Sequence, residues 1–220
     1  MVTETEFLEA VQKGELDKVV SWLGSQPGLA SAKTPEGLSA VLLAAYHGQP
    51  AIAHLLAERR RDLNIFEAAA SGRVEWVRQL VEKQPALANA VAPDGFQPLG
   101  LACFFGHFEA AKCLVEHGAE INSASHNPAK VMPLHSAAAS QSLEIARLLL
   151  EHKADPNARQ DDDFTPLQGA AQNGQVEMAE LLLSYGADLH AVQAQGQTAL
   201  SIAEKAGKKE MVAFLKQQGA

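Results

Sequence analysis

Residues 164–190 read FTPLQGAAQNGQVEMAELLLSYGADLH and predict two short helices joined by a glycine. Thr165 can cap the first helix, and a proline in the first turn costs nothing because its missing amide hydrogen would be unpaired there. Gly174 favours a helix end, since glycine adopts the left-handed C-cap conformation without strain. The stretch VEMAELLLSYG carries apolar residues on one broad face, which predicts a second helix that stops at Gly186.

This arrangement recurs along the whole chain. The residues that end the predicted first helices are spaced by 34, 24, 34, 35, 33 and 33 positions, so seven helical pairs fill the sequence. Residues 5–48 match residues 63–106 at 14 of 44 positions. One helical pair cannot bury its apolar faces alone, which predicts a single domain of stacked units. The residues that end the predicted first helices are Gly14, Gly48, Gly72, Gly106, Gln141, Gly174 and Gly207, and the approximate units are 3–33, 34–62, 63–91, 92–126, 127–159, 160–192 and 193–220.

Several short motifs resemble the ankyrin repeat family. They are TPLQ at Thr165, MPLH at Met132, QPLG at Gln97, GH at Gly106, GAEIN at Gly118, KADPN at Lys153 and GADLH at Gly186. The first and third units depart most from the family pattern. The resemblance implies an all-α solenoid of antiparallel helix pairs with short β-hairpin or turn tips. The short step of 24 residues should then delete the hairpin between the second and third units and leave a notch.

Composition restricts the class of function. The chain has 18 Lys and Arg against 26 Asp and Glu, which gives a net charge of −8. This charge disfavours nucleic-acid binding and attraction to anionic membranes. No apolar run reaches the roughly 18 residues of a membrane span, and the polar, acidic start does not resemble a secretory signal. With only two cysteines, we expect a cytoplasmic protein without a disulfide scaffold.

No catalytic motif appears, and we predict a protein without enzymatic activity, cofactor or metal. The family resemblance assigns His135 to hydrogen bonds between neighbouring units. Cys103 and Cys113 are interpreted as small buried side chains, although a redox pair stays open. The three acids at 161–163 are interpreted as a solvated cluster, and ERRRD at 58–62 as a solvated helix end.

In this family the concave face is formed by the hairpin tips and the ends of the first helices. Carrying these positions over gives a candidate surface on which four of the eight Phe residues gather. Exposed aromatics are typical of contact sites, although a local packing cluster is the competing interpretation. We expect a partner protein with an apolar anchor ringed by Lys or Arg. The candidate residues are Leu38, Tyr46, His47, Phe96, Phe104, Phe105, Val131, Phe164, Gln172, Asn173, Asp161, Asp162 and Asp163; the pair Ala70–Ser71 holds an equivalent helix end, and Asp94 an acidic rim position.

Two other functions stay open at this stage. The aromatic surface could join copies of the chain, although a monomer is favoured. Alternatively, the notch between the second and third units could hold a small ligand, with Arg59, Arg60 and Asp62 as its polar groups.

Overall fold

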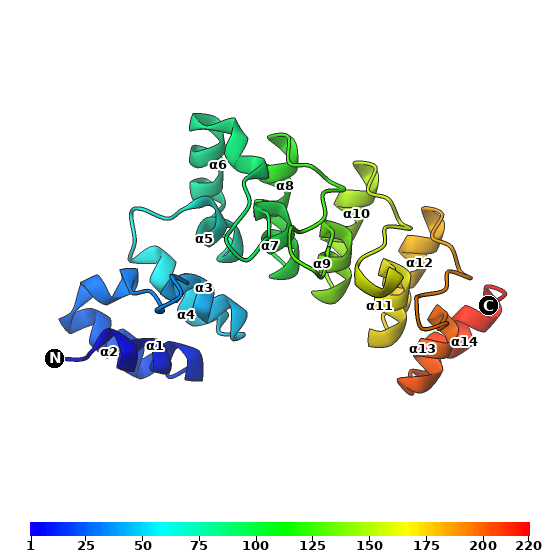
Figure 1. The fold of residues 1–220 in the computed structure, drawn as a ribbon, viewed down its shortest axis with the longest axis horizontal. Helices are drawn as coiled ribbons and strands as arrows, with labels where there is room; N and C mark the ends of the chain where they lie inside the picture. The colour runs from blue at the N-terminus through cyan, green and yellow to red at the C-terminus, as the bar shows by residue number, and fades with distance from the viewer.

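The computed structural model describes residues 1–220 as an all-α stack of helix pairs (Figure 1). In each pair the second helix folds back on the first, and successive pairs lie side by side with the two termini at opposite ends. The predicted fold class is confirmed. The helices are α1 Glu4–Lys13, α2 Leu16–Ser25, α3 Ala40–Tyr46, α4 Pro50–Glu58, α5 Ile65–Ala70, α6 Val74–Lys83, α7 Pro98–Phe104, α8 Phe108–Glu116, α9 Pro133–Ala139, α10 Leu143–Glu151, α11 Pro166–Asn173, α12 Val176–Ser184, α13 Ala199–Lys205 and α14 Lys209–Gln217, with short 3-10 helices η1 Pro27–Ser31, η2 Pro85–Asn89 and η3 Asp161–Asp163.

Helix α11 shows how the sequence sets the helix ends. The Thr165 side chain accepts a hydrogen bond from the amide of Gln168 (3.3 Å), and the Gln168 side chain accepts one from the amide of Thr165 (2.9 Å). This reciprocal capping box satisfies two amides that the helix itself leaves unpaired. Pro166 occupies the first turn, and Gly174 ends the helix at φ 77°. The end signals of this segment are therefore confirmed.

One continuous core runs through the stack. Its large members include Phe7, Leu99, Leu149 and Leu182, all of which are fully buried. Alanines of the first helices, such as Ala102, are buried beside them. Because alanine is small, neighbouring first helices can approach closely while leucines fill the space behind them.

The tips between units are short turns, and backbone hydrogen bonds close them, such as those from the Ala92 amide to the Phe96 carbonyl (2.9 Å) and from the Gln193 amide to the Gln197 carbonyl (3.1 Å). The only β-bridge joins Lys33 to Ser39. Backbone groups of the later tips also bond to the neighbouring tip: the amides of residues 126, 161 and 194 donate to the carbonyls of Gly95, Ala129 and Asp162 at 2.8–3.0 Å. These bonds link each of the later tips to the next and fix their positions relative to one another.

A second series of bonds links the ends of the second helices. Asn89 donates from its side-chain amide to the Gly118 carbonyl (2.9 Å) and accepts from the Glu120 amide (2.8 Å). Asn122 and Asn157 make the same paired contacts with the next units. We call these three side chains the amide clamps. They join consecutive units from η2 to the turn after α12.

The stack is interrupted between α4 and α5. Residues 59–64 join these helices without a tip, as the short step of the sequence predicts. Helices α4 and α6 barely touch, whereas the other consecutive second helices pack along each other. Figure 1 shows α1–α4 set at an angle to the row α5–α14. Only two hydrogen bonds join residues 1–58 to residues 65–220, from Tyr46 to Asp94 and from Arg73 to Glu58.

The expectation of a solvated ERRRD segment is wrong for Arg60. Its guanidinium is buried and bonds to Glu67 at the start of α5, whose side chain is 1% exposed. Arg60 also bonds to Asp62 (2.9 Å). This buried ion pair replaces the missing tip as the contact between the linker and α5. Arg60 and Asp62, which were candidate ligand-binding groups for the notch, are therefore already bonded to each other and, through Arg60, to Glu67.

His135 makes the expected contact between units. Its Nε2 lies 3.0 Å from the Phe164 carbonyl, just as Gln168 bonds to the Gln197 carbonyl at 3.1 Å one unit later. The other ring nitrogen, Nδ1, is buried without a partner. A neutral imidazole fits this environment, because a charged ring would bury an unsatisfied donor.

Stability should therefore fall in mild acid. Burial lowers the pKa of His135 to about 4, whereas the unfolded value lies near 6.5. The unfolded chain thus binds more protons between these values, so stability present at pH 7 is lost as the pH falls through 6.5 towards 4. The expected loss between pH 7 and pH 4.5 is roughly 2.5 kcal/mol. Urea unfolding of the wild type and His135→Gln at pH 7 and pH 4.5 measures it. The glutamine occupies the position as Gln168 does one unit later and does not titrate, so this variant should lose less stability between pH 7 and pH 4.5 than the wild type. If the free energy of unfolding changes equally in both proteins, the loss does not come from His135.

Candidate partner-binding surface

Three aromatic side chains from the ends of α3 and α7 form a row, which we call the aromatic stack. The rings of Tyr46 and Phe105 lie 5.7 Å apart, and Phe104 meets Phe105 edge to face at 5.1 Å, a geometry that aromatic quadrupoles favour. Tyr46 and Phe105 are half-buried, while Phe104 is 47% exposed. The stack therefore supports one outward aromatic ring on two inner ones.

The Tyr46 hydroxyl anchors the stack across the missing tip. It donates a hydrogen bond to the Asp94 carboxylate in the tip before α7, 48 residues away. Burial and this hydrogen bond raise the pKa of Tyr46 far above its usual range, so the phenol stays a donor. Asp94, expected as part of a free acidic rim, instead holds the aromatic stack.

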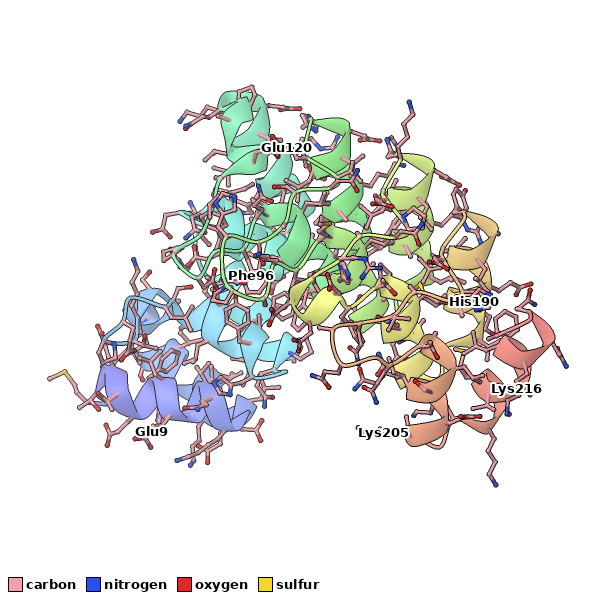
Figure 2. All side chains as sticks on the ribbon, turned by 45° about the vertical axis from the view of Figure 1, so that its right-hand side comes forward. Glu9, Phe96, Glu120, His190, Lys205 and Lys216 are labelled. Atoms are coloured by element: carbon pink, nitrogen blue, oxygen red, sulfur yellow. The ribbon has the colours of Figure 1, made fainter.

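Six predicted residues come together around one hollow of about 290 Å³, which we call the tip groove. Figure 2 labels one of them, Phe96, which lies in the tip before α7. Residues of the tips line one side of the tip groove, and residues of the first helices line the other. The six are Phe96, Phe104, Val131, Phe164, Gln172 and Asn173.

A larger hollow of about 490 Å³ lies at the interruption of the stack, and we call it the wedge. Ala45, Ala53 and His54 of the α3–α4 pair line one side, and the ends of α5, α7 and α9 line the other. Phe104 borders both the wedge and the tip groove. The predicted notch therefore exists as a hollow, but Arg59, Arg60 and Asp62 do not line it.

Other candidate residues lie outside these hollows or are covered. Leu38 is half-buried against the core, and His47 is exposed, but neither lines the tip groove or the wedge. The helix end at Ala70–Ser71, expected to be exposed, is buried. His107 folds over it, with Nε2 3.1 Å from the Ala70 carbonyl.

The acids at 161–163 are exposed, as expected. Asp163 lies 3.8 Å from Arg159, while Asp161 and Asp162 make no ion pair. Gln160 and Phe164, which flank these acids in the sequence, both line the tip groove. The negative charge therefore stands at one end of the tip groove, whereas the side chains that line both hollows include no Asp, Glu, Lys or Arg.

The remaining chemical groups are accounted for by packing. Cys103 and Cys113 are buried free thiols, which confirms the interpretation as small core side chains. Burial raises the pKa of both thiols, which disfavours the reactive thiolate. No group of three or more His, Cys, Asp or Glu side chains is placed to bind a metal ion. None of the helices has the length and apolar character needed to cross a bilayer.

A sequence model described as "Ankyrin repeats (3 copies)" matches residues 65–160 and 134–220. The chain belongs to the ankyrin repeat family. Its ankyrin relatives include cyclin-dependent kinase 4 inhibitor B of Rattus norvegicus, 40% identical over 94 residues, 42% of this chain and 68% of that protein. Protein phosphatase 1 regulatory subunit 27 of Homo sapiens is 31% identical over 101 residues, 46% of this chain and 64% of the relative.

Alpha-latroinsectotoxin-Lt1a of Latrodectus tredecimguttatus is 37% identical over 71 residues, 32% of this chain and 5% of the toxin. The chain spans less than two thirds of the length of the toxin and of the phosphatase subunit. Ankyrin repeats, together with relatives that are regulatory or inhibitory proteins, support a protein-interaction module.

Sequence reasoning missed part of this ankyrin surface. Ala53 and His54 of α4, which line the wedge, were not assigned to the predicted surface, because each unit was treated as equivalent. The step of 24 residues was the available signal. It marks the junction between α4 and α5, where the tip is missing and the second helices α4 and α6 do not pack along each other.

Proposed function

We propose that this chain is a non-enzymatic protein-binding module that captures its partner at the tip groove, with Phe104 as the central anchor. The observation that carries the proposal is the exposure of Phe104 between two hollows, supported from below by Phe105 and Tyr46. A ring held in place before binding loses little conformational freedom when a partner covers it. The regulatory and inhibitory relatives support a role exercised through binding.

Replacing Phe104 with aspartate tests the proposal. Buried aromatic anchors contribute about 2 kcal/mol or more to binding, so we expect at least a roughly 30-fold loss of partner affinity. The matched control is Tyr185→Asp, because Tyr185 is 40% exposed at the end of α12 and lines neither hollow.

The measurement is affinity capture from an extract of the native cells, with the retained proteins quantified by mass spectrometry. Wild type and Tyr185→Asp should retain the same proteins, and Phe104→Asp should lose them. Circular dichroism should show equal helix content in all three chains. If Phe104→Asp retains the same proteins in the same amounts as the wild type, the proposed site is wrong.

A further inference from the structure

We infer that the partner contributes one basic and apolar segment that lies across Phe104, with an apolar side chain in the wedge, another in the tip groove, and a Lys or Arg beside Asp161 and Asp162. This inference rests on the proposed function and specifies the partner at the same site. It gives the segment both a composition and a direction.

The first support is the geometry of Phe104. Its exposed ring forms part of the wall of the wedge and part of the wall of the tip groove, so a segment that covers the ring reaches both hollows. The inner rings and the Tyr46–Asp94 hydrogen bond fix the ring from below. A single segment therefore has two recesses available, and the Phe104 ring forms part of the wall of both.

The second support is the chemistry of the wedge. Its lining consists mainly of alanine, glycine, proline and phenylalanine, with two serines and two histidines. Burial lowers the pKa of His107, which favours the neutral ring, and its Nε2 is engaged with the Ala70 carbonyl. The Nε2 atom of His54 lies 3.3 Å from a carboxylate oxygen of Glu58, and the same oxygen lies 3.4 Å from Nη1 of Arg73. Nearby charges are thus paired, and the wedge fits an apolar side chain.

The third support is the charge at the other end. Asp161 and Asp162 stand without an ion-pair partner between Gln160 and Phe164, two residues that line the tip groove. A basic side chain placed there would gain complementary charge, and an acidic one would be repelled. Since the wedge offers no comparable acidic group, the basic residue belongs at the tip-groove end of the segment.

A display experiment with random peptides in place of the partner tests both composition and direction. A library of random short peptides is selected on the immobilised wild-type chain, and each recovered peptide is measured against Phe104→Asp and four further variants. His54→Trp fills the wedge from α4, and Asp161→Lys reverses charge at the tip groove. The matched controls are Lys112→Trp, which holds the corresponding exposed position of α8, and Glu177→Lys, an exposed acid on α12.

We expect recovered peptides to carry two apolar residues with Lys or Arg towards one end. They should bind about tenfold more weakly to His54→Trp and to Asp161→Lys, and the effect of Asp161→Lys should shrink as salt rises. Binding to the two control variants should match that to the wild type.

The outcomes separate this inference from the proposed function. Peptides that are lost on Phe104→Asp but bind His54→Trp and Asp161→Lys normally would overturn the two-hollow segment and leave the proposed function standing. If no recovered peptide distinguishes the wild type from Phe104→Asp, the proposed function itself fails. Sedimentation at several concentrations adds a further check: a dimer abolished by Phe104→Asp would identify a second copy as the occupant and overturn the inference.

Discussion

Replacing Glu67 with alanine is expected to lower the free energy of unfolding by about 3–5 kcal/mol, because it leaves the buried guanidinium of Arg60 without its partner. Glu67 is 1% exposed and also accepts the amide of Asn64 at the start of α5, at 2.9 Å. The substitution therefore removes a charge partner and half of a capping box at once. Urea unfolding followed by circular dichroism measures the loss.

Glu75→Ala is the matched control for Glu67→Ala. Its carboxylate lies 3.9 Å from Arg78 at the surface, with 75% of the Glu75 side chain exposed, and exposed pairs of this kind contribute about 0–1 kcal/mol. A double substitution, Arg60→Met with Glu67→Leu, should recover much of the lost stability, because it removes both buried charges together. Equal losses for Glu67→Ala and Glu75→Ala would show that the buried pair does not hold the linker.

Replacing Gly95 with alanine should destabilise the chain by about 2–5 kcal/mol, the sum of backbone strain and overpacking. Gly95 has φ 88°, and an added Cβ would lie 2.8 Å from the backbone nitrogen of Asn127 in the next tip. The carbonyl of Gly95 also accepts the amide of His126. The tips would have to separate to admit one methyl group.

The chain supplies its own control for Gly95. Gly37 holds the equivalent position 58 residues earlier with φ 89°, yet a Cβ there would meet no atom within 4 Å. Gly37→Ala should therefore cost only the strain, about 1–2 kcal/mol. The difference between the losses in free energy of unfolding of Gly95→Ala and Gly37→Ala measures the cost of overpacking between the neighbouring tips. If both variants unfold at the same urea concentration, the tips are not held together as the structure shows.

Local signals predicted much of the fold from the sequence. The threonine, proline and glycine around α11 specify both of its ends, and the structure places them as expected. The gathering of Phe96, Phe104 and Phe164 around one hollow also followed from their positions, since Phe96 and Phe164 lie at the tips of the fourth and sixth units and Phe104 lies at the end of a first helix.

The remaining features depend on contacts that no local pattern encodes. Tyr46 reaches Asp94 only because the intervening tip is absent, so its half-buried state could not be predicted from α3 alone. Arg60 lies in a run of charges that is typical of a solvated helix end, and only the folded linker brings it to Glu67. Both departures fall at the shortened step, where the assumption of equivalent units fails.

The amide clamps have a mechanical consequence. They begin at Asn89 and join successive units as far as Asp188, while the junction after α4 has in their place two side-chain hydrogen bonds and the ion pair between Arg60 of the linker and Glu67. Tension applied to the two termini should therefore detach the four N-terminal helices first, as a separate early rupture, and the clamped remainder should resist to a higher force.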